Sequence, residues 1–155
     1  GEAHKNHLNL VNAWAILAKD NIYPTLLLTM NDDDTFLYNK ILIEIQKYNL
    51  NIIIHSRLPR NELLSYYDRV SALIYPSFFE CFGIPLLEAK NHNLPVIAAE
   101  LDYVRDIIDP VETFDPNSSK SIARAVRRFL CREEKIIPVL TAEEFAKELV
   151  LYANK

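Results

Sequence analysis

Two carboxylates flank a glycine in the stretch SFFECFGIPLLEAK, residues 77–90. Glu80 and Glu88 have seven residues between them, and Gly83 is one of only two glycines in the 155-residue chain. Ordinary usage of about 7% would supply roughly eleven. A glycine lets the backbone adopt a positive φ or approach a ligand closely. Each carboxylate can accept two hydrogen bonds from neighbouring hydroxyl groups, so the stretch is suited to a hydroxyl-rich ligand such as a sugar.

The residues after Gly83 add an attraction for anions. Pro85 fits the first turn of a helix, and the free N–H groups at a helix start attract an anion such as phosphate. Glu88 falls about one turn into that helix, so its side chain points back toward the loop. Structural roles explain the same residues, because Ser77 and Glu80 have capping-box spacing and Glu88 gains from the helix dipole. Spacing alone leaves both interpretations open.

The elements around this stretch alternate between strands and helices. Short continuous apolar runs predict strands buried on both faces, and apolar residues at helical spacing predict helices between them. The predicted strands are residues 25–29, 51–55, 71–75, 95–99 and 112–114. The predicted helices are residues 7–20, 35–48, 60–69, 85–92, 103–108, 117–131 with Asn117 or Ser118 as cap, and a last helix from the capping box Thr141 and Glu144. This alternation indicates a mainly parallel sheet covered on both faces, the doubly wound α/β class.

The organisation of the chain favours a single domain. Its 155 residues are 50% hydrophobic by type, enough for a real core, and no repeat, low-complexity tract or linker interrupts them. Sheets of this class usually begin with a strand, whereas this chain opens on a helix, so a first strand is expected ahead of Gly1. The loop at residues 76–84 follows a predicted strand. Ligands of doubly wound sheets collect beyond the carboxyl ends of the strands, where this loop lies.

Charge and composition argue against several classes of function. The formal net charge is −4 and the Lys and Arg residues are scattered, so nucleic acid is not an expected partner. Cys81 and Cys131 lack metal-ligand spacing and suit free thiols, which favours the cytoplasm. No apolar run approaches the roughly 18 to 20 residues that span a bilayer, and no signal peptide is visible.

The order of residues around the glycine is more specific than the spacing. The run LIYPSFFECFGIPLLEAKNHNLPVIAAE resembles the motif of the group 1 (family 4) glycosyltransferases, roughly P-S-x-x-E-G-F-G-x-P-x-x-E-A and then P-V-I-A. The residues in register are Pro76, Ser77, Glu80, Phe82, Gly83, Pro85, Glu88, Ala89, Pro95, Val96 and Ile97. Further segments that resemble the family are HKNHLNLVNAWAIL, SRLPRNELLSYYDRVSALIY and FDPNSSKSIARAVRRFL. The resemblance therefore covers nearly the whole chain.

The resemblance implies the C-terminal, donor-binding domain of a GT-B fold, in which two Rossmann-like domains face each other across a cleft. Residues 1–155 would be this single nucleotide-sugar-binding domain, and the N-terminal acceptor domain would lie outside the chain. The implied activity is a retaining transfer from a nucleoside-diphosphate sugar to a glycan or lipid-linked acceptor, in capsule, O-antigen or lipopolysaccharide biosynthesis. This fragment alone is expected to be inactive. No cofactor or metal is implied, and the expected location is the cytoplasm, with peripheral contact at the inner face of the membrane as an option.

Carried over by position, the resemblance gives each site residue a role. Glu80, the catalytic residue, would contact hydroxyls of the transferred sugar, and Glu88 would hold the ribose hydroxyls. Lys5 would neutralise the diphosphate, and the family's partnering Arg would lie ahead of Gly1. Backbone N–H groups for the donor would come from Phe82, Gly83 and Ile84. The segment expected beside the base is Ser56, Arg57 and Leu58.

Some positions depart from the family's pattern. Cys81 replaces a glycine beside Glu80, and Asn93 replaces a glycine that usually ends the helix, a left-handed position that Asn tolerates. Asp102 and Tyr103 stand where the family often shows a Gly-Gly pair near the donor. These departures bear on donor identity.

Two other clusters have chemical alternatives. Residues 31–34, NDDD, contain the Asp-x-Asp spacing that can hold a divalent cation on a diphosphate, but they also precede a helix that Asp would cap. Capping explains them without a metal. Arg124, Arg127 and Arg128 form a basic patch on the late helix, which is either a solvated face or a contact with anionic lipid.

Two other functions keep the same fold. One is a non-catalytic Rossmann-like interaction module with a vestigial nucleotide site, and the other is a sugar-nucleotide epimerase. The joint presence of Glu80, Gly83, Glu88 and Lys5 favours a working donor site, because a vestigial site has no chemical need for all four.

Overall fold

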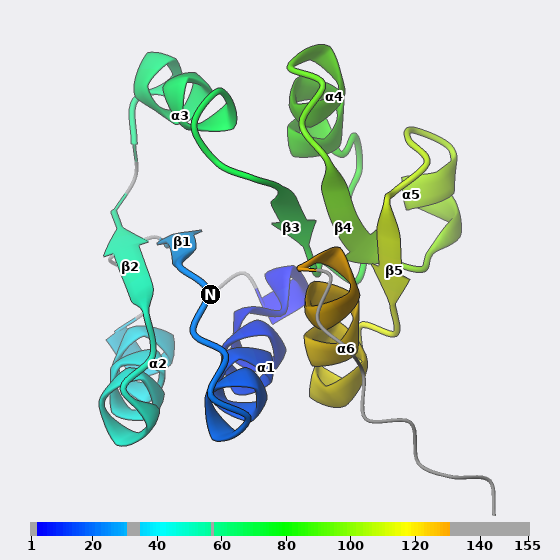
Figure 1. Ribbon diagram of the computed structural model, residues 1–155. Coiled ribbons are helices and arrows are strands. Elements are labelled where there is room, and N and C mark those ends of the chain that lie inside the picture. The colour runs from blue at the N-terminus through cyan, green and yellow to red at the C-terminus, as the bar shows by residue number, and fades with distance from the viewer. Residues whose placement is uncertain (1–2, 31–34, 57, 131–155) are drawn as a thin grey trace, which may run out of the picture.

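The computed structural model describes residues 3–30, 35–56 and 58–130 (Figure 1). The elements in chain order are η1 (Ala3–Lys5), α1 (His7–Lys19), β1 (Leu26–Thr29), α2 (Thr35–Tyr48), β2 (Ile52–His55), α3 (Arg60–Tyr67), β3 (Leu73–Tyr75), α4 (Ile84–Asn91), β4 (Val96–Ala99), α5 (Asp102–Arg105), β5 (Glu112–Phe114) and α6 (Ser119–Phe129). The order confirms the predicted alternation of strands and helices. The predicted helix from Thr141 lies outside the described residues.

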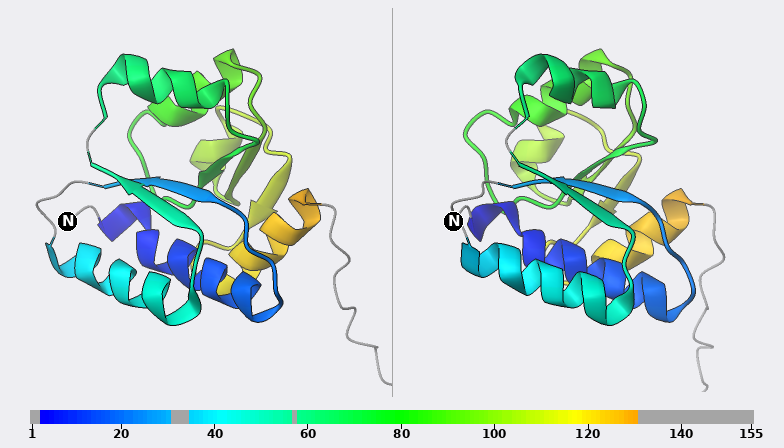
Figure 2. Two further views of the ribbon diagram at one scale, coloured as in Figure 1. Left: turned by 60° about the vertical axis from the view of Figure 1, so that its left-hand side comes forward. Right: turned by 90° about the vertical axis from the view of Figure 1, so that its left-hand side faces the viewer.

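Every strand pair in the described part of the chain is parallel. Strand β1 pairs with β2, and β4 pairs with β3 on one side and β5 on the other. Helices α3 and α4 lie on one side of the strands and α1, α2 and α6 on the other (Figures 1 and 2). The fold is therefore the predicted doubly wound, mainly parallel α/β type.

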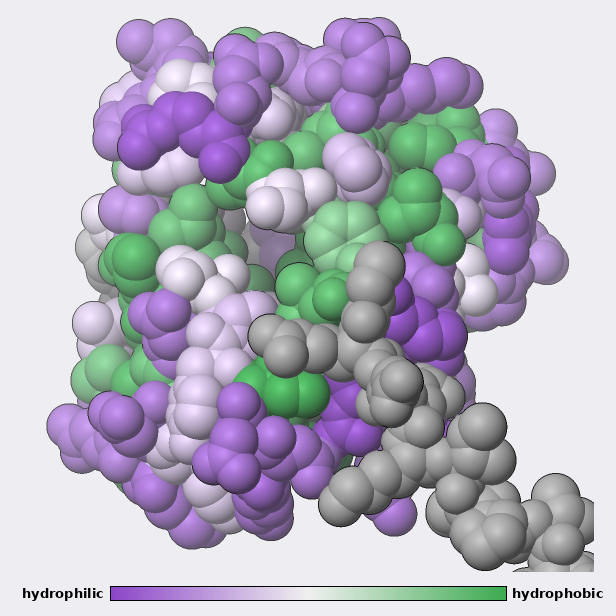
Figure 3. Space-filling view, viewed as in Figure 1, coloured by the Kyte–Doolittle hydropathy of each residue, from purple (hydrophilic) through white to green (hydrophobic). Residues whose placement is uncertain are grey.

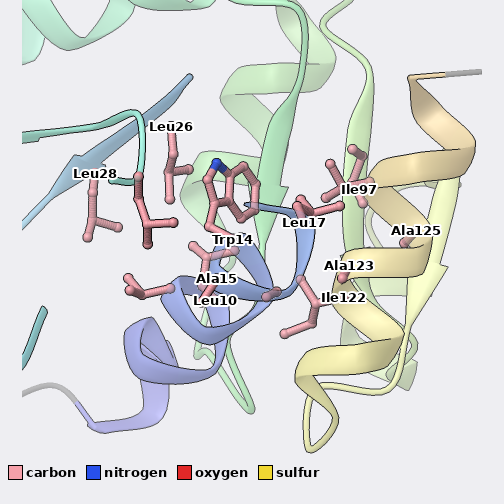
Figure 4. Packing of buried hydrophobic residues seen from close by; sticks show 14 of the residues in the cluster. Leu10, Trp14, Ala15, Leu17, Leu26, Leu28, Ile97, Ile122, Ala123 and Ala125 are labelled. Carbon is pink, nitrogen blue, oxygen red and sulfur yellow. The ribbon is translucent and has the colours of Figure 1, made fainter. Parts of the chain in front are cut away.

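Helix α1 forms the centre of the larger core. Its buried residues cover more than one face, and Trp14 and Leu17 pack with Leu26 of β1, Ile97 of β4 and Ile122 of α6 (Figure 4). This confirms that the helix packs against a broad surface. A second core on the other side joins α3, α4 and α5 to β3 and β4. Its buried residues are Tyr67, Tyr75, Leu86, Ala89, Leu94, Val96, Ala98 and Val104.

Strands β1 and β3 each have one open edge among the described strands. The amide of Leu26 donates to Asn51 just before β2, and the amide of Leu73 donates to Pro95 just before β4. Because successive amides of a strand point to opposite sides, the amides of Leu27 and Ile74 point away from β2 and β4. Both strands are apolar on both faces yet partly exposed, whereas β4, paired on both sides, is buried throughout. Figure 3 shows the surface hollowed near the centre of the view, beside hydrophobic residues.

Local boundaries differ from expectation in two places. The helix predicted over residues 103–108 is α5, which spans only Asp102–Arg105, although the amides of Ile107 and Ile108 still donate to the Val104 carbonyl just beyond its end. The helix after Gly83 begins at Ile84, one residue earlier than predicted. Of the two candidate caps of α6, Ser118 is the cap, and its hydroxyl accepts the Ser121 amide at 3.2 Å.

Candidate functional site

Gly83 ends the loop after β3 and starts α4. Its backbone lies in the left-handed region, with φ 54° and ψ 39°. A Cβ at this position would lie 2.7 Å from Ile107 Cδ1 and 3.3 Å from Leu86 Cδ1. The backbone conformation therefore favours a glycine here, and a Cβ would also force Ile107 Cδ1 to move. The same conformation occurs at Asn93, with φ 51°, as predicted for the end of α4.

Replacing Gly83 with Ala is expected to lower the free energy of unfolding by about 1–3 kcal/mol, because a Cβ is strained in this conformation and Ile107 must move. Chemical denaturation measures this change. Asn93→Gly is the matched control, since it keeps a residue at positive φ and removes a Cβ rather than adding one. If Gly83→Ala unfolds at the same denaturant concentration as the parent protein, the conformational requirement is wrong.

The start of α4 carries backbone donors without protein acceptors. No side chain caps the helix, and Pro85 in the first turn has no N–H. Within the described residues, the amides of Phe82, Gly83 and Ile84 donate to no other group. Phe82 and Ile84 are exposed, 76% and 51%, whereas Gly83 between them is buried, so an anion from solvent would approach the helix start beside Phe82 and Ile84.

Glu88, in the second turn of α4, is held from two sides. Its side chain is only 11% exposed, and its Oε1 lies 2.7 Å from Arg60 Nη2 at the start of α3. Its Oε2 accepts a hydrogen bond from the Tyr67 hydroxyl at 3.1 Å. Burial and then the Glu88 charge raise the pKa of Tyr67, so the hydroxyl remains a donor at neutral pH. These contacts join α3, which follows β2, to α4, which follows β3.

Glu80 lies on the other side of the loop with different neighbours. Its Oε1 is 3.5 Å from the Ser77 hydroxyl, which donates to it, and 3.7 Å from His4 Nε2. The ring of Phe79 stacks on His4 with 5.0 Å between centroids. The capping-box interpretation of Ser77 and Glu80 is wrong, because no helix begins at Ser77 and its hydroxyl contacts the carboxylate instead of a helix amide.

Two tyrosines border Glu80, the buried Tyr75 and the partly buried Tyr103. The Tyr103 hydroxyl donates to the Ser77 carbonyl at 2.8 Å, which ties the segment after β4 to the site loop. Burial, and then Glu80, raises the pKa of Tyr103 to about 12. The Tyr75 hydroxyl is buried and has no hydrogen-bond partner among the described residues, and burial and Glu80 raise its pKa as well. Both tyrosines are therefore neutral at neutral pH.

The segment that carries Lys5 is fastened to the same loop. The His4 carbonyl accepts the Phe78 amide at 2.9 Å. Asn6, 7% exposed and with φ 59°, donates through Nδ2 to the Pro76 carbonyl at 3.1 Å and the Pro116 carbonyl at 2.7 Å. These bonds place the backbone of Lys5 beside the ends of β3 and β5.

Asn6→Ala is expected to lower the free energy of unfolding by about 1–3 kcal/mol, because the buried Pro76 carbonyl loses its donor and the Pro116 carbonyl keeps only the hydrogen bond from Asn9. Thermal and chemical denaturation measure the loss. Asn12→Ala on the exposed side of α1 is the matched control and is expected to change stability by less than about 0.5 kcal/mol. Equal stability of the two variants would show that Asn6 does not anchor the segment.

The segment expected beside the base follows β2. Ser56 is exposed and Leu58 partly exposed, while Arg57 lies outside the described residues. Tyr66 and His55 lie next to it, with the hydroxyl 3.3 Å from Nε2. The segment therefore sits at the carboxyl end of β2, on the side from which Arg60 reaches Glu88.

Several residues of the site were not predicted from the sequence: His4, Asn6, Arg60, Tyr67 and Tyr75. Only Asn6 had a local signal, since an Asn directly before a helical pattern often marks a helix start. The others act through contacts between elements far apart in the chain.

The alternatives for metal and lipid receive little support. No group of three or more His, Cys, Asp or Glu side chains could hold a metal ion in residues 3–30, 35–56 and 58–130, and the Asp-x-Asp at 32–34 lies outside them. On α6, Arg127 pairs with Asp20, and Arg128 lies 2.6 Å from a Glu112 oxygen. These two ion pairs neutralise part of the positive charge of the basic patch. None of the helices in these ranges is long and apolar enough to cross a membrane.

Comparisons with known proteins bear on the family and the fold. The family model for glycosyl transferases group 1 matches residues 1–147. The O-antigen chain mannosyltransferase RfbU of Salmonella typhimurium is 35% identical over 68 residues, which are 43% of this chain and 19% of that protein. The chain thus aligns with about a fifth of this relative's length.

Two solved structures share the fold. Sucrose-phosphate synthase from Thermosynechococcus elongatus superposes with a TM-score of 0.70 and 26% identity, over 84% of this chain and 34% of that one. The C-terminal domain of a group 1 family glycosyl transferase, LpcC, from Francisella tularensis gives a TM-score of 0.72 and 23% identity, over 84% and 71% of the two chains. Because the family model covers nearly the whole chain, the chain belongs to the group 1 glycosyl transferases.

Proposed function

We propose that this domain binds the nucleoside-diphosphate sugar donor of a retaining glycosyltransferase that builds surface polysaccharide. The observation that carries the proposal is the placement of Glu80 and Glu88 on either side of the uncapped start of α4, with the Lys5 segment fastened to the same loop. An anion fits the backbone amides, and the carboxylates can accept hydroxyl groups on each side of it. The similarity to an O-antigen mannosyltransferase supports the polysaccharide setting.

The chemical contribution of such a site is electrostatic and positional. The amides of Phe82, Gly83 and Ile84, with Lys5, would stabilise the negative charge that develops on the departing diphosphate. Glu88 would hold the ribose and Glu80 the transferred sugar, so that the reacting carbon faces the acceptor. No metal is needed for these roles.

We also propose that an acceptor-binding domain and one more strand come from polypeptide upstream of this chain. The open edges of β1 and β3 support the strand, because a parallel strand between them would pair with Leu27 on one side and Ile74 on the other. The small share of the relative's length that this chain spans supports the second domain. We expect the 155-residue fragment alone to transfer no sugar.

Calorimetric titration of the full-length protein with nucleoside diphosphates of different bases tests the donor proposal. We expect one of them to bind, and to bind more tightly than its nucleoside, since the amides and Lys5 contact only the phosphates. Titrations of every base without heat above background would overturn the proposal and favour the interaction module. Incubation with the donor alone separates the epimerase, because only that enzyme would return an isomerised nucleotide sugar.

A cytoplasmic location stays a prediction. Peripheral contact with a membrane through α6 is a weaker proposal, because Arg127 and Arg128 both have acidic partners. Binding of the full-length protein to anionic vesicles, compared with neutral ones, would measure it directly.

A further inference from the structure

We propose that Tyr67 is a positioning residue for the donor's ribose, and that Arg60 is a counter-ion which the ribose hydroxyls displace from Glu88. The proposal rests on the proposed function, since it concerns how the same carboxylate is held before and after the donor binds. Its basis is the pair of contacts on Glu88, one oxygen to each partner.

The two partners of Glu88 differ in how firmly they are held. Tyr67 is 7% exposed, and its ring belongs to the core that joins α3 to α4. It packs beside His92, with 5.5 Å between ring centroids. The hydroxyl therefore cannot leave Oε2 without opening that core. The Tyr67 contact is a fixed part of the site.

Arg60 is held far more loosely. Its side chain is 71% exposed and it is the first residue of α3. Ion pairs of such exposed side chains contribute little and are screened by salt. With Oε2 occupied by Tyr67, Oε1 is the oxygen left to accept ligand hydroxyls, and Arg60 occupies it at 2.7 Å. A ribose diol would thus replace Arg60 and leave the Tyr67 contact in place.

The test is a comparison of two ligands on three proteins. The ligands are the nucleoside diphosphate that binds best and its 2′,3′-dideoxy analogue, which lacks the ribose diol. In the parent protein we expect the diol ligand to bind about 10- to 100-fold more tightly, as for hydrogen bonds to a charged group. In Tyr67→Phe this ratio is expected to fall by about 3- to 10-fold, with the dideoxy affinity unchanged.

Arg60→Ala is expected to act in the opposite direction. Removing the competing counter-ion should raise affinity for the diol ligand by about 2- to 5-fold and leave the dideoxy ligand unaffected. Because Arg60 is exposed, this variant should fold even if Tyr67→Phe is unstable. The matched control is Tyr48→Phe on α2, on the opposite side of the sheet, which should alter neither affinity (Figure 1).

Four results would each overturn the proposal or one part of its basis. If Tyr67→Phe weakens both ligands equally, or neither, Tyr67 acts only in packing. If Arg60→Ala lowers affinity for the diol ligand, Arg60 attracts the donor instead of competing with it. If the parent protein binds neither ligand, the proposed function itself is wrong. If the parent protein binds the diol and dideoxy ligands equally well, only the assignment of the ribose to Glu88 is wrong.

Discussion

Replacing Glu80 with Gln in the full-length protein is expected to reduce the rate of sugar transfer about 100-fold, because the transferred sugar loses the carboxylate that orients it. The change keeps the size of the side chain and removes its charge. Affinity for the nucleoside diphosphate should change little, since under the proposed function that part of the donor would lie toward the start of α4 and Glu88. Steady-state kinetics measure the rate, and calorimetry measures the affinity.

Glu44→Gln is the control for this variant. It removes the same charge from α2, which lies across the sheet from the site loop (Figure 1), and is expected to leave both rate and affinity unchanged. A transfer rate for Glu80→Gln within a few-fold of the parent would contradict the role given to this carboxylate. An equal fall in affinity for the nucleoside diphosphate would indicate that Glu80 contacts the diphosphate part of the donor and not the sugar.

Replacing Glu88 with Ala is expected to weaken nucleoside diphosphate binding about 10- to 100-fold, since hydrogen bonds to an ionised acceptor are the stronger kind. The side chain is nearly buried, so the same change leaves the Tyr67 hydroxyl without its acceptor and lowers the free energy of unfolding by about 1–3 kcal/mol. Titrations should therefore be run well below the melting temperature of the variant.

Glu88→Gln separates the two effects. Glutamine can still accept the hydrogen bond from Tyr67, so stability should recover more than affinity does. Binding by Glu88→Ala equal to that of the parent would contradict the assignment of the ribose to this residue, whatever the change in stability.

The strands were predictable because their signal is local. Runs such as LLLT and LIY are apolar on both faces, and only a strand covered from both sides accommodates them. The positive φ at Gly83 was also foreseeable, since a single glycine in a loop before a helix often marks such a backbone. The family motif also placed Glu80 in the loop before the helix and Glu88 within the helix, where the structure has them.

The remaining contacts could not be predicted, because they join distant parts of the chain. Asn6 meets Pro116 across 110 residues, and Tyr67 meets Glu88 only because α3 and α4 pack side by side. Local spacing also misled in one case. Ser77 and Glu80 have the spacing of a capping box, but the chain continues as a loop to Gly83 before α4 begins.

The most direct test asks where on the protein the donor binds. Backbone amide shifts of the isotope-labelled full-length protein, titrated with nucleoside diphosphate, report this residue by residue. We predict the largest shifts at Gly83, Ile84 and Glu88, with none along α2 on the opposite side of the sheet. Shifts confined to α2 or α6, or a titration that moves no amide of the loop and α4, would contradict the donor site at this helix start.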